Sequence, residues 1–314
     1  MVVTGEGWRA PGVLLRTLRE EAGLDLATLA PTSVGESRAA FWVTDRAGTV
    51  SLLKIMPGSP AGLVAQLRAL EAMTARLRAR GYPAARITAL GRTAVFAFWI
   101  QQCLPGRPLD LRPGFPGLAQ LAALLPELIR LNDAQAGLGT GTGDWPALLT
   151  RTLTEGEDGY CVHATLAARP DTRDMLRVVR EIGASCGPAI PSGTDYVHYD
   201  FTPSNLLADG ATITGVIDMN APVLTGDRGF DLATLLFYAY DHDGIRARLG
   251  ARLLELAGPR AARAYLAHIV LRQVDWSVRH HPQAPFTRRH LHLASHIITD
   301  IAGGDPPWSR LSQS

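Results

Sequence analysis

Two short apolar runs, each next to isolated acidic or amide side chains, constrain the fold of this chain most. One lies in residues 197–207, Val-His-Tyr-Asp-Phe-Thr-Pro-Ser-Asn-Leu-Leu, and the other in residues 213–220, Ile-Thr-Gly-Val-Ile-Asp-Met-Asn. Each apolar stretch is typical of a short buried strand. We therefore expect hydrophobic strands to deliver Asp200, Asn205 and Asp218 to the rim of one small space.

These three side chains indicate a cation site. Two carboxylates and an amide oxygen suit a hard cation such as Mg²⁺, which prefers oxygen ligands and keeps some water for phosphates. The alternative is that they are ordinary turn-forming residues at strand ends. Turn chemistry explains each residue singly but not their joint spacing. His198-x-Asp200-x-x-x-x-Asn205, followed by a strand and Asp218, is also the catalytic-loop spacing of kinases.

A third element follows in residues 226–233, Gly-Asp-Arg-Gly-Phe-Asp-Leu-Ala. Together the three elements resemble the aminoglycoside phosphotransferase family, whose members have a protein-kinase-like fold and phosphorylate hydroxyl groups of small molecules. The resemblance implies that Asp200 faces the acceptor hydroxyl as catalytic base. It implies that Asn205 and Asp218 hold magnesium ions. It also implies that Asp231, at an expected N-cap position, hydrogen-bonds the catalytic-loop backbone.

The chain departs from the family pattern at two positions that bear on acceptor geometry. Tyr199 stands where glycine is usual, and Asn132 stands at a helix end where a histidine is frequent. Neither departure removes a charge that phosphoryl transfer needs.

One lysine stands out in the charge composition. Of 31 basic residues 30 are arginine, and the remaining one is Lys54. A lysine ammonium is a compact point charge, whereas a guanidinium is a wide planar fork, so a narrow slot beside phosphates favours lysine. Apolar residues on both sides of Lys54 predict a strand over residues 49–56 and argue against a simple surface charge. In the resemblance, Lys54 meets the phosphates of ATP.

Further ATP contacts are implied by the resemblance alone. Ser33, Gly35 and Ser37 would form the phosphate-facing turn, although a lone glycine fits an ordinary hairpin turn about as well. Gln102 and Leu104 would hold the adenine with backbone groups at a hinge.

Glu71 lies within a predicted helix over residues 61–80. In the kinase scheme a helix glutamate pairs with the strand lysine and orients it. The alternative is a surface ion pair with Arg68, three residues earlier on the same helix face.

The resulting fold prediction is an α+β, protein-kinase-like, two-lobed chain. A small antiparallel-sheet ATP-binding lobe is expected over residues 1–104, with a leading helix over 11–22 and strands over 26–34, 38–44, 49–56, 86–90 and 93–101. A mostly helical catalytic and acceptor-binding lobe is expected over residues 105–314. Its helices are predicted over 116–136, 145–153, 172–186, 231–240, 244–256, 259–279 and 286–302, with Pro126 kinking or splitting the first.

Composition narrows the setting. The chain has 314 residues, 46% hydrophobic and 19% charged, which indicates a globular protein. A net charge of +2 does not favour nucleic acid as a partner. Without a membrane-length apolar run or a signal peptide, we expect a cytoplasmic monomer or homodimer with no membrane partner. Cys103, Cys161 and Cys186 are scattered, as expected of reduced thiols.

The late helices bear on the acceptor. Residues 272–296 contain four arginines and five histidines against one acid, Asp275. Coulomb attraction would not concentrate a polycation such as an aminoglycoside there. The spacings His280-His281 and His290-x-His292 do not make a good zinc set.

The sequence therefore predicts an ATP- and Mg²⁺-dependent O-phosphotransferase. Its acceptor would be a neutral or acidic small molecule with a hydroxyl group, such as a nucleoside- or macrolide-type natural product, with antibiotic resistance as a consequence. The alternatives are a primary-metabolite kinase acting on choline, homoserine or a sugar, and a nucleotide-binding pseudoenzyme.

Overall fold

The structure is a computed structural model that describes residues 10–32, 40–58, 62–111, 117–141, 143–157, 160–219 and 221–304. The chain divides into two compact units. Unit 1 comprises Met1–Pro105 and Thr214–Val223, and unit 2 comprises Gly106–Ile213 and Leu224–Ser314. The chain passes from unit 1 to unit 2 after Pro105, beside the expected lobe boundary. The return of Thr214–Val223 to unit 1 was not predicted, because the sequence analysis placed a single boundary between the lobes.

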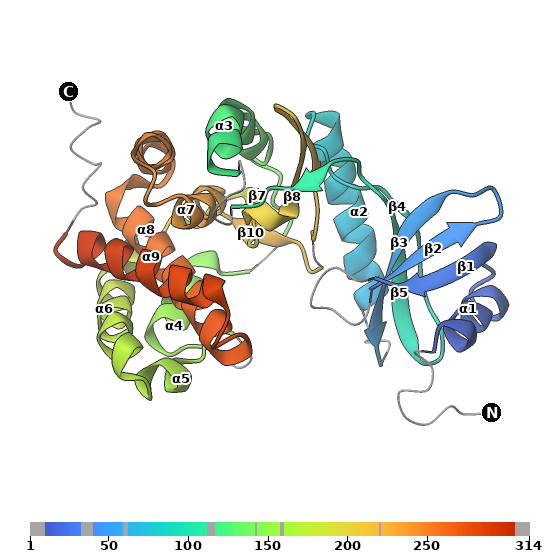
Figure 1. Ribbon diagram of the computed structural model, residues 1–314, viewed down its shortest axis with the longest axis horizontal. Helices are drawn as coiled ribbons and strands as arrows, with labels where there is room; N and C mark the ends of the chain where they lie inside the picture. Colours follow the sequence, from blue (N-terminus) through green and yellow to red (C-terminus); the bar gives the residue numbers. More distant parts are fainter. Residues whose placement is uncertain are drawn as a thin grey trace. The chain divides into compact units, whose positions relative to one another are not determined.

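Unit 1 contains a five-stranded antiparallel sheet in the order β1-β2-β3-β5-β4 (Figure 1). Two helices, α1 (Pro11–Glu20) and α2 (Leu63–Ala79), pack against it. The meander and both helices were predicted, with ends that differ by at most three residues where both are described. The strands are β1 (Leu26–Pro31), β2 (Ala40–Asp45), β3 (Val50–Pro57), β4 (Ile87–Arg92) and β5 (Phe96–Gln102).

Both faces of this sheet are covered at β5, whose first five residues, Phe96–Ile100, are apolar and buried. Successive side chains of a strand point to opposite faces. Phe96 and Phe98 pack in one core cluster with Leu14 and Leu18 of α1. The cluster on α2 contains Leu63, Leu67, Ala97 and Trp99. The continuous apolar run of β5 is thus typical of a strand buried on both sides.

The segment around Thr214–Val223 joins unit 1 through specific hydrogen bonds. The backbone N–H of Val216 donates to the Pro83 carbonyl at 2.9 Å, and Ala84 forms a parallel bridge with Val216. The Thr214 hydroxyl donates to the Pro105 carbonyl at 2.6 Å. These bonds fix the stretch that carries Asp218 to unit 1.

Short strands carry the two motif runs. A three-stranded sheet has the order β6-β8-β9, with β6 at Arg107–Pro108, β8 at Leu206–Asp209 and β9 at Thr212–Val216. A separate antiparallel pair joins β7 (Asp195–Val197) to β10 (Leu224–Gly226). The expectation of a short strand in each run is confirmed, because β8 begins at Leu206 within the first run and β9 covers Ile213–Val216 of the second.

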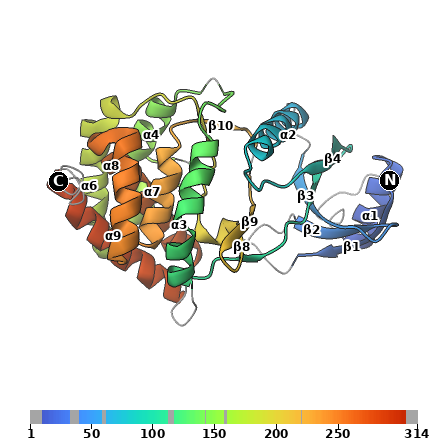
Figure 2. The ribbon, with the colours of Figure 1, turned by 90° about the horizontal axis from the view of Figure 1, so that it is seen from above.

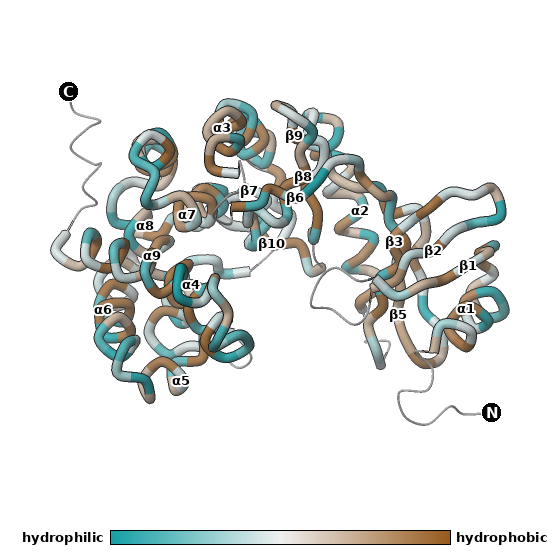
Figure 3. Tube along the Cα trace, viewed as in Figure 1, coloured by the Kyte–Doolittle hydropathy of each residue, from teal (hydrophilic) through white to brown (hydrophobic). Residues whose placement is uncertain are grey.

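Unit 2 is mostly helical. Helix α7 lies at its centre and packs against α3, α8 and α9 (Figure 2), and residues 229–237 of α7 are all buried. Polar and apolar residues alternate along the outer helices (Figure 3), as expected of helices with one buried face. The helices are α3 (Gly117–Ala134), α4 (Trp145–Thr154), α5 (His163–Ala167), α6 (Pro170–Cys186), α7 (Gly229–Tyr238), α8 (Asp243–His280) and α9 (Pro285–Ala302).

Two prolines have different effects on these helices. In α8, Gly258 has φ 76° and Pro259 follows, so two helical segments meet at a kink where the sequence predicts separate helices. Pro126 instead lies inside α3, which runs as a single helix.

Among the described residues, no helix is long and apolar enough to cross a membrane. Cys103, Cys161 and Cys186 are all free thiols.

Candidate active site

The loop between β7 and β8, residues 198–205, holds Asp200 and Asn205 together. The Asn205 side-chain nitrogen donates to Asp200 Oδ2 at 2.9 Å and to the Asp200 backbone carbonyl at 2.9 Å. The Asp200 side chain is 30% exposed, so a ligand can reach it. With its nitrogen directed to Asp200, the amide of Asn205 has its oxygen to offer to a cation.

The second oxygen of Asp200 meets an arginine from α8. Arg272 Nη2 lies 3.2 Å from Asp200 Oδ1, and the Arg272 side chain is 13% exposed. Its Nη1 donates to the Tyr199 carbonyl, and its guanidinium lies 4.5 Å from the centre of the Tyr199 ring. Each oxygen of Asp200 is therefore oriented by a different donor.

Sequence reasoning placed Arg272 among the late basic residues but did not assign it a role. Arg272 directly follows the fully buried run Ile269–Leu271. A charge in an apolar helix face must find a partner. That rule was the available signal, although it does not identify Asp200 as the partner.

Tyr199 adopts a backbone conformation that favours glycine. Its φ is 70°, in the left-handed region, which costs an ordinary residue about 1–2 kcal/mol. The Tyr199 ring stacks on Phe230 with centroids 5.2 Å apart, and its hydroxyl lies 3.3 Å from His268 Nε2. The resemblance expects glycine here, and the structure shows which contacts offset the strain of a tyrosine.

Asp231 of α7 anchors the backbone of the 198–205 loop by hydrogen bonds. Its Oδ2 accepts from the backbone N–H of His198 at 2.8 Å, and its Oδ1 accepts from that of Tyr199 at 2.9 Å. Gln135 Nε2 donates to Oδ2 at 2.8 Å. Burial raises the pKa of Asp231, and these donors act in the opposite direction. The expected bond from Asp231 to the loop backbone is confirmed.

The expected N-cap position of Asp231 is wrong. Helix α7 begins two residues earlier, at Gly229, with Arg228 as its N-cap. Asp231 is within the first turn, and its carboxylate serves the 198–205 loop instead of its own helix.

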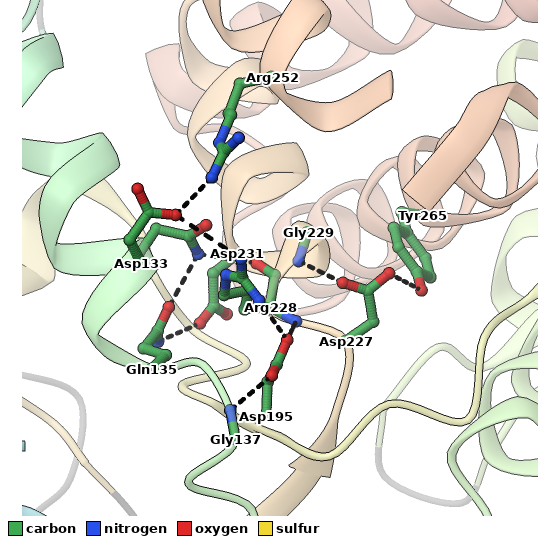
Figure 4. A network of polar contacts seen from close by, with 11 residues as sticks. Asp133, Gln135, Gly137, Asp195, Asp227, Arg228, Gly229, Asp231, Arg252 and Tyr265 are labelled. Atoms are coloured by element: carbon green, nitrogen blue, oxygen red, sulfur yellow. Dashed lines mark hydrogen bonds and ion pairs between the residues drawn. The ribbon is translucent and has the colours of Figure 1, made fainter. Parts of the chain in front are cut away.

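A wider polar network fixes the start of α7 (Figure 4). Asn132 donates to Gln135 Oε1 at 2.8 Å and to the Arg228 carbonyl at 2.9 Å. Asp227 accepts from the Gly229 N–H at 2.8 Å and from the Tyr265 hydroxyl at 2.8 Å. These bonds support the element that carries Asp231. Asn132, where the family often has histidine, therefore acts as a neutral bridge.

In unit 1, Lys54 and Asp218 lie together. Lys54 Nζ is 2.7 Å from Asp218 Oδ1, and the lysine side chain is the more buried of the two. Asp218 has φ 63°, also in the left-handed region. A residue near the end of β3 and a residue 164 positions later are thereby brought into contact.

Glu71 differs from both expectations for it. Its Oε1 accepts from Arg78 Nη2 at 2.7 Å, and its Oε2 accepts from the Ile87 backbone N–H at 2.8 Å. Among the described residues, Lys54 pairs with Asp218 and not with Glu71. Glu71 thus ties α2 to the start of β4, because Arg78 lies two turns along the same helix and Ile87 opens that strand. In this arrangement it does not orient the lysine.

The remaining predicted ATP contacts are only partly described. Ser33, Gly35 and Ser37 lie outside the described residues. Gln102 ends β5, and its backbone N–H donates to the Arg86 carbonyl at 2.9 Å. Leu104 is half-buried in the loop that follows. Adenine binding at Gln102 and Leu104 stays a prediction.

A family comparison covers most of this geometry. The model described as "Phosphotransferase enzyme family" matches residues 28–265, which include both the lysine strand and the 198–205 loop. The chain belongs to this family. It is a small-molecule kinase with a hydroxyl acceptor. No curated protein sequence matches the chain.

Solved structures show that this phosphotransferase has the predicted protein-kinase-like fold. An aminoglycoside phosphotransferase from Alicyclobacillus acidocaldarius is 16% identical, with 92% of this chain and 93% of that chain covered and a TM-score of 0.55. A Thermobifida fusca protein described as a fructosamine-3-kinase is 18% identical, with 90% of this chain and 97% of that chain covered and a TM-score of 0.54. An aminoglycoside phosphotransferase from Streptomyces rimosus, in complex with ADP and streptomycin, is 19% identical, with 83% and 97% covered and a TM-score of 0.51.

Proposed function

We propose that this phosphotransferase transfers the γ-phosphate of ATP to a hydroxyl of a neutral or acidic small molecule. The observation that supports this most is the Asp200 carboxylate, held on one oxygen by Asn205 and on the other by Arg272. In that position Asp200 orients the acceptor hydroxyl and takes its proton. Phosphoryl transfer asks a protein mainly for positioning and charge neutralisation, so no covalent nucleophile is required.

The donor set on the chain fits ATP with Mg²⁺. We assign the metal to Asn205 and Asp218, because an amide oxygen and a carboxylate are ligands that Mg²⁺ prefers. When bound, Mg²⁺ neutralises charge on the phosphate oxygens. Lys54 supplies a compact positive charge for the same phosphates, and Asp218 holds its ammonium in position at 2.7 Å.

The preference for a neutral or acidic acceptor rests on Arg272. Its guanidinium lies against the catalytic carboxylate, where a polycation would meet like charge. Asp275, the one acid of residues 272–296, is fully buried and paired with Arg279 at 2.7 Å, so it has no charge to offer an acceptor. Nucleoside- and macrolide-type natural products fit this electrostatic setting. Phosphorylation of such a compound in the cytoplasm would confer resistance to it.

A compound panel with ATP and Mg²⁺ tests the proposal. Mass detection of a phosphate added to the acceptor would be run on nucleosides, macrolides, aminoglycosides, choline, homoserine, sugars and a fructosamine. We expect the highest kcat/KM for a neutral or acidic compound, with the Asp200→Asn variant as the control for contaminating kinases. A preference for aminoglycosides would refute the acceptor class. ATP binding without phosphate transfer to any compound would favour a pseudoenzyme.

A further inference from the structure

Three side chains of types that ligate metals meet on unit 2, and none of them is assigned to phosphoryl transfer. Asp241 follows α7, and His292 and His296 lie on α9; we call these three residues the Asp241 cluster. His296 Nδ1 is 3.1 Å from Asp241 Oδ1, and His292 Nε2 is 3.4 Å from Asp241 Oδ2. One ligand atom from each of the three residues lies within 4.8 Å of the others.

The backbone places these groups together without help from a ligand. His292 and His296 are four residues apart on one helix, so they lie on the same face. Tyr240 is fully buried, and its hydroxyl donates at 2.8 Å to Asp300 Oδ2, one helical turn beyond His296. His242 accepts from the Ile245 N–H as the N-cap of α8. Asp241 is therefore flanked by two anchored residues, one of them bonded to α9 itself.

The Asp241 cluster can supply three ligands to a tetrahedral zinc ion. Zn–N and Zn–O bonds of about 2.0–2.2 Å give tetrahedral ligand–ligand separations of roughly 3.3–3.6 Å. His296 Nδ1 lies 3.1 Å from Asp241 Oδ1 and His292 Nε2 lies 3.4 Å from Asp241 Oδ2, so both histidines already contact the carboxylate, and side-chain rotation would bring both nitrogens around one of its oxygens. The His292 and His296 side chains are 55% and 52% exposed, so their rings can adjust and water can fill a fourth position. Two imidazoles with one carboxylate suit Zn²⁺, whereas Mg²⁺ prefers oxygen ligands.

We propose that Asp241, His292 and His296 bind a Zn²⁺ ion that links α9 to the connection between α7 and α8. The closer histidine pairs in the sequence, His280-His281 and His290-x-His292, are not this set. The pair that counts has the four-residue helical spacing, and its third ligand comes from 51 residues earlier in the chain. The ion would fasten the last helix to the element that carries Asp231.

Zinc titration of the full chain tests this site. Metal-free protein would be titrated with ZnCl₂ by calorimetry, and with CoCl₂ by its visible absorption, which reports tetrahedral coordination. The variants are His292→Ala, His296→Ala and Asp241→Asn. The matched control is His280→Ala, because His280 is an exposed histidine on α8 outside the cluster.

We expect one Zn²⁺ per chain in the wild type and in His280→Ala. Loss of an outer-sphere partner already weakens metal affinity by about 10–100-fold, so loss of a ligand should weaken it at least about tenfold in each cluster variant. Zinc should also raise the thermal unfolding midpoint of the wild type and the control, but not that of His292→Ala. A large excess of Mg²⁺ should not displace the zinc.

Two results would overturn the proposal. One is the absence of one-to-one zinc binding in the wild type, which would leave the cluster as a set of Asp–His contacts only. The other is equal zinc affinity in the wild type and in folded His292→Ala and His296→Ala, with circular dichroism establishing that both variants are folded. Phosphotransferase activity enters neither readout, so the outcome is independent of the proposed reaction.

Discussion

The two oxygens of Asp200 are held by Asn205 and Arg272, and its role as catalytic base can be tested by substitution. We expect Asp200→Asn to lower kcat by about 10²–10⁴-fold, the range that a general base contributes, because the amide cannot take the acceptor proton. ATP binding should remain nearly unchanged. Steady-state kinetics with the best acceptor and a nucleotide-binding titration measure the two effects.

The matched control for this substitution is Asp209→Asn. Asp209 is an exposed aspartate at the end of β8, four residues beyond Asn205. Its variant should turn over at the wild-type rate. Wild-type turnover in Asp200→Asn would contradict the assigned base.

Arg272 provides the charge that sets the expected acceptor class. Arg272→Met removes the guanidinium beside Asp200. We expect the ratio of kcat/KM for a cationic acceptor over a neutral one to rise about tenfold, equivalent to about 1.4 kcal/mol of differential transition-state binding. Total activity should fall, because Asp200 loses one of its two orienting donors.

Arg288→Met, an exposed arginine of α9, is the control and should leave that ratio unchanged. If Arg272→Met lowered activity toward all acceptors by the same factor, Arg272 would be a positioning residue without influence on selectivity.

At the scale of residues, the contacts of the site could be predicted where the two partners are close in sequence. The pairing of Asp200 with Asn205 follows from a five-residue spacing, and so does their common loop. Arg272 reaches Asp200 from 72 residues away, and no local pattern encodes that contact. Glu71 was misread for a related reason: its helix was predicted correctly, but the choice among Lys54, Arg68 and Arg78 depends on side-chain packing.

At the scale of elements, Asp231 connects helix α7 to the 198–205 loop. It accepts hydrogen bonds from two backbone N–H groups of that loop, those of His198 and Tyr199. Asp231→Asn replaces one acceptor oxygen by an NH₂ group that faces a donor. We expect a loss of about 1–3 kcal/mol in the free energy of unfolding, the cost of leaving a buried donor unsatisfied. Urea unfolding measures it, and kcat should fall as the loop loosens.

Asp174→Asn, at an exposed position of α6, is the matched control and should unfold as the wild type does. Unchanged stability in Asp231→Asn would show that the loop is held by other contacts.

Most elements were predictable from periodicity, and the errors have physical causes. The start of α7 was placed two residues late because aspartate is a good N-cap type, while this aspartate is used in tertiary contacts. The short helix α5 was missed because five residues carry too little periodic pattern. The return of Thr214–Val223 to unit 1 depends on hydrogen bonds to Pro83 and Pro105, which the strand pattern does not reveal.

At the scale of the whole molecule, buried histidines couple stability to pH. Burial lowers the pKa of His268 to about 3, with the nearby Arg272 charge acting in the same direction. Burial likewise lowers the pKa of His290 to about 4. In the unfolded chain both groups bind a proton near the ordinary value of 6.5. Between that value and the folded pKa, the unfolded state holds more protons, so stability falls as pH falls.

The histidine contribution can be isolated by substitution. Burial raises the pKa of Asp227 and Asp231, and such carboxyl groups act in the opposite direction, losing stability as pH rises. The quantity to measure is therefore the difference between wild type and His268→Gln in the free energy of urea unfolding at pH 7, 6 and 5. Below pH 6.5 we expect the wild type to lose up to about 1.4 kcal/mol per pH unit more than His268→Gln.

The control is His280→Gln, because His280 is an exposed histidine, and this variant should follow the wild type. Parallel pH profiles for wild type and His268→Gln would mean that His268 is protonated in the folded protein, and that its contact with Tyr199 tolerates the charge.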